Sequence, residues 1–209
     1  MKNTLLQLNT SLFSNDGQST RLAGEFVARW RERNPGATVL VRDLASDPVP
    51  HLTAERFQAF LTIPGERTPE QEAAVAYSNA LIDELSRADV IVIGLPMYNF
   101  GVPSTLKAYF DHVARAGVTF RYGEKGPVGL LTGKKAYVIT TRGGYHAGTA
   151  TDSEKAYVGT FLGFLGITDV EFIYAEGLAI SASAREAGLA QARQAIGRVH
   201  ATRRDLLAA

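Results

Sequence analysis

Cysteine is absent from this chain of 209 residues. Its absence excludes disulfides, thiol redox chemistry and cysteine-ligated metal sites, so any redox chemistry requires a bound cofactor. Long apolar runs are missing as well, because no stretch approaches the roughly 20 residues of a membrane-spanning helix. Residues 1–9 form a short strand-like run without the regions of a signal peptide. We therefore expect a cytoplasmic protein that does not act at a membrane.

An excess of charge of either sign is also absent. The chain has 22 Lys and Arg residues and 21 Asp and Glu residues, a formal net charge of +1 at pH 7. Binding to a nucleic acid backbone needs a basic stripe, and the basic residues here are scattered, so nucleic acid is not an expected partner. With 45% hydrophobic residues, the length suits a single domain over residues 1–209 with one continuous core.

Short apolar runs alternate with segments of helical periodicity along the chain. The runs predict strands over residues 4–8, 38–41, 88–95, 136–140 and 170–175. The periodic segments predict helices after residue 19 and over residues 54–61, 69–87, 104–116, 157–165 and 182–207. This alternation predicts an α/β fold with a doubly wound, five-stranded parallel sheet and helices on both faces. The Gly-rich stretch 119–133 predicts an excursion with little regular structure.

Local signals fix some helix boundaries more sharply. Thr68, Pro69 and Gln71 combine an N-cap hydroxyl, a proline at the first helical position and a glutamine three residues after the cap. This combination predicts a capping box at the start of a long helix. Gly117 and Gly166 are expected to end the helices that precede them.

The loop over residues 10–19 follows the first strand and enters a helix. Ligands of open parallel sheets bind beyond the carboxyl ends of the strands, which makes this loop, rich in hydroxyls and backbone N–H groups, a candidate binding segment. A helix N-terminus attracts phosphate through oriented amides and the helix dipole, with no lysine required. A second interpretation is that Ser19 or Asp16 only caps the helix. Both interpretations remain open on the sequence.

The loop after the buried third strand contains Pro96, Met97, Tyr98, Asn99 and Phe100. A planar apolar ring fits against such side chains while Asn99 and backbone N–H groups reach its heteroatoms. The alternative is a turn whose aromatic residues only fill the core. Its position at the predicted ligand edge of the sheet favours binding.

The loop after the fourth strand contains Thr141, Arg142, Gly143 and Gly144. Two adjacent glycines let the backbone approach a ligand closely, and their N–H groups suit the carbonyl oxygens of a partly anionic ring. A flexible turn is the alternative. No dinucleotide-binding G-x-G-x-x-G motif follows the first strand, and residues 129–135 lack the spacing of a P-loop. Metal-spaced histidines and a G-x-S-x-G elbow are absent from the sequence too, so no metal is expected.

Together these segments resemble the bacterial FMN-dependent NADH-azoreductases and related NAD(P)H:quinone oxidoreductases. The resemblance covers essentially the whole chain and implies a flavodoxin-like fold. It is strongest over residues 95–107, 117–122, 133–135, 141–144 and 160–166. By this resemblance, Ser11, Gly17, Gln18 and Ser19 hold the phosphate and ribityl end of a tightly but non-covalently bound FMN. Residues 96–100 flank the isoalloxazine, and residues 141–144 bond to its pyrimidine edge.

The resemblance also implies the reaction. NADH or NADPH passes a hydride to the flavin N5 and leaves, and a quinone then takes two electrons in the same place. This ping-pong cycle needs no catalytic residue of the protein. Two cycles cleave an azo compound to amines, and nitro compounds are further possible acceptors. The alternative is a flavodoxin-type electron carrier that acts on protein partners, although such carriers are commonly strongly acidic and this chain is near neutral.

The resemblance finally implies a homodimer with two FMN sites, each completed by residues of the other subunit. Aromatic and polar residues from several segments are candidates for the walls of the substrate pocket. They are Phe60, Asn99, Phe120, Tyr122, His146, Phe161 and Phe164. Ordinary core or interface packing is the alternative for each aromatic residue, and Phe161 and Phe164 are spaced so that one of them suits the core.

Overall fold

The computed structural model describes residues 3–200. At its centre lies a five-stranded sheet of order β2-β1-β3-β6-β7, and every pairing within it is parallel. The strands are β1 (Thr4–Asn9), β2 (Thr38–Asp43), β3 (Val90–Pro96), β6 (Lys135–Thr141) and β7 (Asp169–Ala175). The predicted α/β fold class is confirmed. Each predicted strand exists, and most extend one or two residues beyond the predicted bounds.

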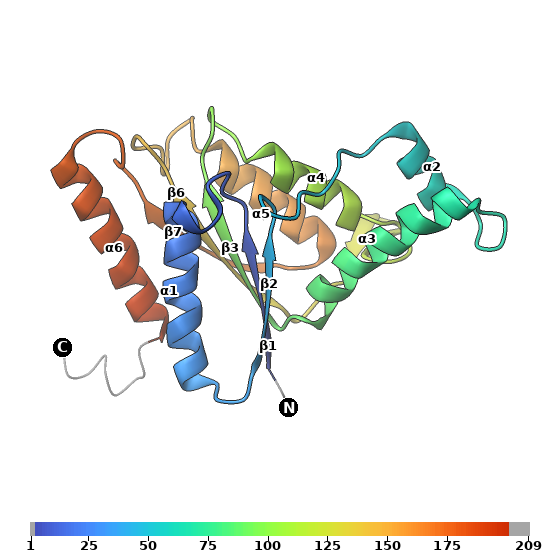
Figure 1. Cartoon of the computed structure of the whole chain (residues 1–209), viewed down its shortest axis with the longest axis horizontal. Helices are drawn as coiled ribbons and strands as arrows, with labels where there is room; N and C mark the ends of the chain where they lie inside the picture. The colour runs from blue at the N-terminus through green and yellow to red at the C-terminus, as the bar shows by residue number, and fades with distance from the viewer. Residues whose placement is uncertain (1–2, 201–209) are drawn as a thin grey trace.

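Helices cover both faces of this sheet. Helices α1 (Gln18–Arg33) and α6 (Ala182–His200) lie on one side, and α3 (Pro69–Arg87), α4 (Ser104–Val113) and α5 (Ser153–Leu165) lie on the other (Figure 1). Successive residues of β3 face opposite layers, since Val92 packs with α1 and α6 while Ile91 and Ile93 pack in the other layer. None of the helices within residues 3–200 is both long and apolar enough to cross a membrane.

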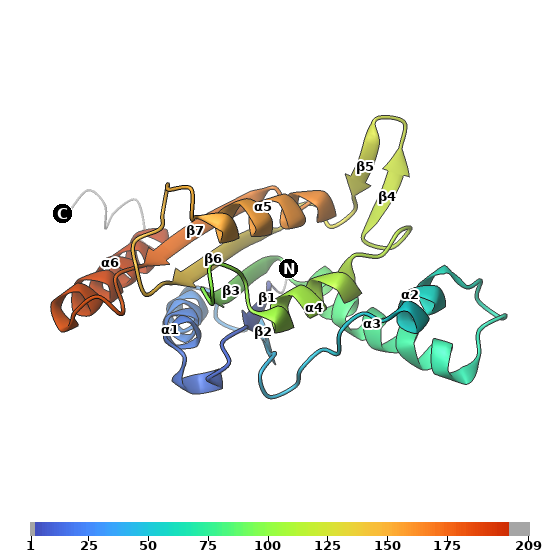
Figure 2. The same ribbon diagram turned by 90° about the horizontal axis from the view of Figure 1, so that it is seen from above.

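Two elements project from the same end of the molecule, as Figure 2 shows. One is the arm, which we define as α2 (Ala54–Leu61) with the first half of α3. The predicted capping box at its turn is confirmed, because Thr68 Oγ1 accepts from the Gln71 N–H at 3.3 Å and Gln71 Oε1 accepts from the Thr68 N–H at 3.1 Å. The other is a hairpin of β4 (Phe120–Gly123) and β5 (Gly126–Gly129).

The hairpin corrects the prediction that residues 119–133 have little regular structure. Phe120 and Tyr122 alternate with Arg121, a period of two that suits a strand. The turn at Glu124 and Lys125 is closed by Gly126, whose φ of 115° is accessible mainly to glycine. The high glycine content therefore concealed a turn and a pair of short strands.

Some helix ends also differ from the prediction. Helix α4 ends at Val113 rather than at residue 116, because the Thr119 hydroxyl donates to the Val113 carbonyl at 2.6 Å and accepts from the Arg115 N–H at 2.9 Å. Helix α5 begins at Ser153 rather than at residue 157. Gly166 ends it with φ 97°, as predicted. Helix α6 is described as far as His200, so its predicted extension to residue 207 lies outside the described residues.

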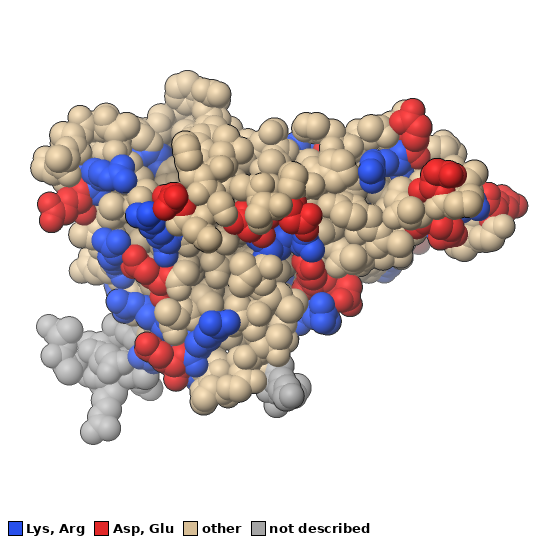
Figure 3. Space-filling view, in the orientation of Figure 1, with Lys and Arg blue, Asp and Glu red and all other residues tan. Residues whose placement is uncertain are grey.

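Charged side chains of both signs intermingle on the face shown in Figure 3, with no broad area of either sign. This distribution agrees with the near-neutral composition. Nothing on this face resembles the continuous basic stripe of a protein that binds a phosphate backbone.

Candidate functional site

The three loops singled out from the sequence meet at the carboxyl edge of the sheet. The Tyr98 hydroxyl reaches from the loop after β3 to the loop after β1, where it lies 3.4 Å from Ser11 Oγ and accepts from the Leu12 N–H at 3.3 Å. The Met97 N–H donates to the Thr141 carbonyl at 2.9 Å and so joins the loops after β3 and β6. The three loops therefore form one connected surface.

The start of α1 has no side-chain cap. The N-cap residue is Gly17, and Asp16 pairs instead with Arg21 at 2.9 Å. This contradicts the interpretation that Asp16 or Ser19 caps the helix. Ser19 Oγ is buried without a hydrogen-bond partner among residues 3–200, and the first amides of a helix have no partner within it. Unpaired donors that converge in this way suit an anion.

Gly17 is required by the close approach of Ser11. A Cβ atom at position 17 would lie 2.1 Å from Ser11 Oγ, which is far inside van der Waals contact. Ser11 is itself buried, and its Oγ accepts from the Phe13 N–H at 3.2 Å. The glycine thus lets the Ser11 hydroxyl lie directly against the beginning of α1.

The loop after β3 contains an unusual turn. Asn99 and Phe100 have φ angles of 51° and 63°, in the left-handed region that residues with a side chain seldom occupy. The turn is closed by two hydrogen bonds between Tyr98 and Gly101, at 3.0 and 3.1 Å. Strain of this kind concentrates at functional sites. Its result here is that Asn99 and Phe100 are exposed at the rim, with the Phe100 ring packed edge-on against His146 at 5.8 Å.

The loop after β6 offers two free donors. The carbonyls of Arg142, Gly143 and Gly144 accept hydrogen bonds from residues 177–179 at 3.0–3.1 Å, and the Arg142 N–H donates to the Ala175 carbonyl. Within residues 3–200, the N–H groups of Gly143 and Gly144 have no acceptor. A ligand edge with carbonyl oxygens is the kind of group that these amides would bind.

The Arg142 side chain lies behind this loop rather than at its surface. Its guanidinium is fully buried and contacts Asp152 at 2.6 Å, Glu154 at 3.1 Å and Glu176 at 3.3 Å. Burial raises the pKa of Glu154 to about 7, against the opposing charge of Arg142. Burial also acts on Asp152, but hydrogen bonds from the Gly148 N–H and Arg142 hold its pKa below the ordinary value.

Comparisons with known proteins bear on this arrangement. Residues 3–199 match a family model described as flavodoxin-like fold. A curated relative from Burkholderia pseudomallei, named FMN-dependent NADH:quinone oxidoreductase, is 57% identical over 196 residues, which cover 94% of this chain and 99% of the relative. The chain belongs to the family of FMN-dependent NADH:quinone oxidoreductases.

Solved structures of azoreductases share the fold. An azoreductase from Bacillus anthracis superimposes with a TM-score of 0.86 at 26% identity over 95% of this chain and 98% of that chain. An FMN-dependent NADH-azoreductase from the same organism, in complex with FMN, gives a TM-score of 0.84 at 26% identity over 95% of this chain and all of that chain. The resemblance inferred from the sequence is therefore confirmed at the level of the family.

Most of the aromatic residues that we proposed for the substrate pocket lie apart from the three loops. Phe60 stacks over the Arg115 guanidinium at 4.2 Å, just beyond the carboxyl end of α4. Phe120 contacts Tyr122 and Phe164 at the same end, at 5.5 and 4.3 Å. The loop after β3 lies at the opposite end of α4, roughly 15 Å away for a helix of this length.

Phe161 lies on α5, whereas His146 belongs to one of the three loops. Phe161 stacks on Phe110 of α4 at 3.9 Å, and it is half-buried like Phe164. His146 lies on the loop after β6, where its Nδ1 is 2.8 Å from Thr151 Oγ1. Asn99 and His146 are thus the two pocket candidates that lie on the three loops.

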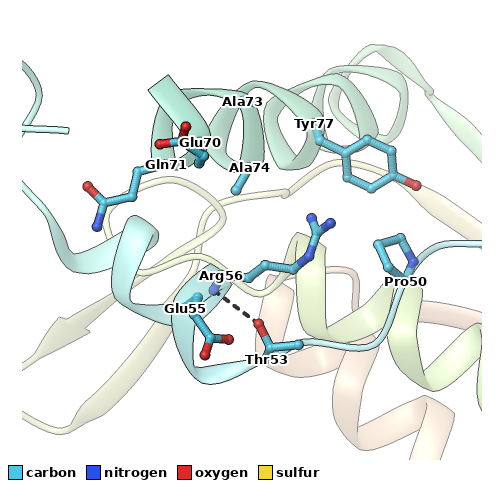
Figure 4. A pocket seen from close by; sticks show the side chains of 9 residues that line it. All are labelled: Pro50, Thr53, Glu55, Arg56, Glu70, Gln71, Ala73, Ala74 and Tyr77. Atoms are coloured by element: carbon cyan, nitrogen blue, oxygen red, sulfur yellow. Dashed lines mark hydrogen bonds between the residues drawn. The ribbon is translucent and has the colours of Figure 1, made fainter. Parts of the chain in front are cut away.

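One cavity lies away from the three loops. A groove of about 550 Å³ runs between α2 and α3, and Figure 4 shows Arg56 pointing into it between Tyr77 and Pro50. It belongs to the arm and shares no lining residue with the three loops.

Sequence reasoning missed two groups at the site. The carboxylates of Asp152, Glu154 and Glu176 organise the loop after β6, and the position of Glu176 directly after β7 was the available signal. Thr20, which follows Ser19 in α1, was also missed, although its hydroxyl is likewise buried and without a partner among the described residues. No signal in the sequence distinguished Thr20 from an ordinary helix residue.

Proposed function

We propose that this protein is an FMN-dependent oxidoreductase that takes electrons from NADH or NADPH and delivers them to quinones and azo compounds by a ping-pong mechanism. The observation that supports it most strongly is the convergence of unpaired donors at one edge of the sheet. These are the buried Ser19 hydroxyl at the start of α1 and the Gly143 and Gly144 amides after β6.

The residues present fit FMN. Ser11, Gly17, Gln18 and Ser19 would hold the phosphate and ribityl end at the uncapped start of α1. Residues 96–100 would flank the ring system, and within residues 141–144 the free Gly143 and Gly144 amides would bond to its pyrimidine edge. FMN, when bound, would accept a hydride and transfer two electrons.

The chain's own contribution is to bind FMN, to orient its ring system and to leave one face of that ring accessible. Burial of Pro96 and the strained turn at Asn99 and Phe100 fix the backbone of the loop after β3. Asn99 and Phe100 remain exposed, so donor and acceptor can stack at the same place in turn. The proposed reaction needs no acid or base from the protein, because the redox chemistry belongs to the cofactor. Nitro compounds are flat enough to be further acceptors.

We also propose a homodimer with shared sites. Large apolar side chains are exposed on the arm and the hairpin, and exposed patches of this kind mark interaction surfaces. They include Phe57, Leu61, Ile63, Tyr122 and Val128. A second copy that covers them would also bring Phe60, Phe120 and Tyr122 to a flavin that their own protomer does not place near them.

The test is oxidation of NADH by the FMN-loaded protein with a soluble quinone and no other protein present. We expect turnover with quinone, and slower release of amines from an azo dye because two cycles are needed. FMN rather than FAD should be released on denaturation, because the start of α1 offers one phosphate site. A protein that binds FMN but passes electrons only through an added protein partner would be a flavodoxin-type carrier and would contradict the proposal.

A further inference from the structure

The Arg142 side chain joins three separate segments of the chain. Its Nε, Nη1 and Nη2 atoms contact Glu154, Glu176 and Asp152 respectively. Asp152 and Glu154 lie at the beginning of α5, whereas Glu176 follows β7. The guanidinium also lies over the Tyr174 ring, 5.0 Å from its centroid. We call Arg142 and the three carboxylates the brace.

The same carboxylates also hold the backbone beyond the two glycines. Glu176 Oε1 accepts from the His146 N–H at 2.7 Å and from the Ala147 N–H at 2.8 Å. Asp152 Oδ2 accepts from the Gly148 N–H at 3.1 Å. Residues 146–148 are therefore tied to the groups that surround Arg142.

The backbone before these residues is fixed as well. Residues 177–179, which directly follow Glu176, donate to the carbonyls of Arg142, Gly143 and Gly144. The carbonyls of Gly143 and Gly144 are thus hydrogen-bonded, and so is the backbone of residues 146–148 after them. The amides of the two glycines have no acceptor within residues 3–200. The brace holds in place the backbone that carries the free donors.

The arrangement is demanding in both charge and shape. A buried cation among three carboxylates is stable only when each group keeps its partners, so loss of one partner leaves an uncompensated buried charge. A planar guanidinium holds its N–H donors in a fixed arrangement on three nitrogen atoms, whereas the ammonium of lysine is a compact point charge with three rotatable donors on a flexible stem. The chain maintains this cluster directly behind two amides that find no acceptor among the described residues.

We propose that Arg142 is a positioning residue: through Asp152, Glu154 and Glu176 it orients the Gly143 and Gly144 amides toward the pyrimidine edge of the flavin. This inference rests on the proposed function. It assigns to Arg142 a role behind the binding surface, in place of the direct contact that the sequence suggested.

The test compares Arg142→Lys with Arg193→Lys, a matched control whose guanidinium pairs with Glu25 on the surface. In Arg142→Lys we expect FMN affinity of the apoprotein to fall about tenfold or more, the effect of losing a group that supports a binding residue. The midpoint potential of the bound flavin should become more negative, because misplaced amides stabilise the reduced, negatively charged ring less. The control should retain both values.

Amide hydrogen exchange and a second variant test the inference independently of the folding of Arg142→Lys. Amide hydrogen exchange of residues 143–148 in the apoprotein should accelerate in Arg142→Lys and not in the control. If Arg142→Lys does not fold, Glu176→Gln, which keeps the size and one oxygen of that side chain, should show the same losses in milder form. A midpoint potential and FMN affinity equal to those of the wild type in the folded variant would overturn the inference. Failure of the wild type to bind FMN would instead contradict the proposed function.

Discussion

Ser19 illustrates how a binding residue can reduce the stability of the protein that carries it. Its hydroxyl is buried and unpaired among the described residues, and a buried polar group without a partner costs about 1–3 kcal/mol. Ser19→Ala should therefore raise the free energy of unfolding of the apoprotein by about 1 kcal/mol. The same change should weaken FMN binding about tenfold or more, because a hydrogen bond to a charged phosphate is lost.

Ser78→Ala is the control for this substitution. The Ser78 hydroxyl is also buried, but it donates to the His112 carbonyl at 2.7 Å and accepts from Arg115 Nη1 at 2.9 Å. This variant should lose stability and keep its FMN affinity. Urea unfolding and fluorescence titration with FMN measure both quantities. A Ser19→Ala apoprotein that is less stable than the wild type would show that the hydroxyl has a structural partner.

Gly144 tests the position of the flavin edge. A Cβ atom there would lie 3.0 Å from His146 Nε2, and its three nearest atoms all belong to the movable ring of that side chain. Gly144→Val should therefore fold normally as apoprotein but bind FMN at least about tenfold more weakly. Gly24→Val, in open space on α1, is the control. Circular dichroism and FMN titration give the result, and unchanged affinity would make Gly144 an ordinary turn residue.

Glu154 should make stability depend on pH. Its folded-state pKa is raised to about 7, mainly by burial, with Asp152 adding to the effect and Arg142 opposing it. A carboxyl group with a raised folded pKa binds more protons in the folded state, so its contribution to stability falls as pH rises from the unfolded pKa to the folded pKa. The other charged or titratable groups around Arg142 are Glu176, a member of the brace, and Tyr174.

The measurement is the difference in the free energy of unfolding between the wild type and Glu154→Gln. As pH rises from 5 to 8, we expect the free energy of unfolding of the wild type to fall by roughly 2–3 kcal/mol relative to that of Glu154→Gln. Glu70→Gln is the control, because backbone and Thr68 hydrogen bonds lower the pKa of this exposed carboxyl group, and its difference from the wild type should not fall between pH 5 and pH 8. A difference that is constant with pH would mean that the pairing with Arg142 outweighs burial and keeps Glu154 ionised throughout.

At the scale of elements, the hairpin depends on one close contact with α5. A Cβ atom on Gly129 would lie 2.0 Å from the Gly166 nitrogen, which is backbone and cannot move aside cheaply. Gly129→Ala should therefore destabilise the protein by roughly 1–3 kcal/mol, as overpacking does. It should also expose residues 120–129 to proteolysis.

Gly163→Ala provides the comparison within the same region. A Cβ atom on Gly163, which lies on α5, would meet no described atom within 4 Å, so this variant should gain up to about 1 kcal/mol from helix propensity. Urea unfolding and limited proteolysis distinguish the two variants. Equal stability of Gly129→Ala and the wild type would show that the hairpin can move away from α5 without loss.

Periodicity was sufficient to predict elements whose pattern is local. The strands of the sheet and α2 follow from apolar runs and capping signals that lie within each segment. The end of α4 does not, because it depends on Thr119, a residue beyond the helix whose hydroxyl replaces the next helical hydrogen bond. The hairpin was missed for a related reason, since glycine content alone does not distinguish a turn between strands from an irregular loop.

At the scale of the whole molecule, the binding surface was predictable in outline because the carboxyl ends of parallel strands meet at one edge. The brace behind this surface was not predictable, since the partners of Arg142 lie at the start of α5 and after β7. The aromatic residues show the same limit. Their spacing in the sequence gives no indication that Phe60 and Phe120 gather at the far end of α4, away from the three loops.

The arrangement of the whole molecule leads to a test of the homodimer. The arm exposes Phe57 and Leu61 at 52% and 60% of their surface, which is costly in water unless another surface covers them. Replacing both with Lys should preserve α2, because Lys is a good helix former and a cation at Leu61, the last residue of the helix, is favourable. We expect the wild type to sediment as a dimer and the double variant to dissociate at least about a hundredfold more readily.

Val41→Lys is the control, because Val41 is 60% exposed but lies on the edge strand β2 rather than on the arm. It should sediment like the wild type. If the flavin site is completed by the arm and hairpin of a second copy, the double variant should also lose quinone turnover while its own three loops still bind FMN measurably. A double variant that is monomeric and fully active would show that each protomer builds its site alone, and that the exposed apolar side chains of the arm serve another purpose.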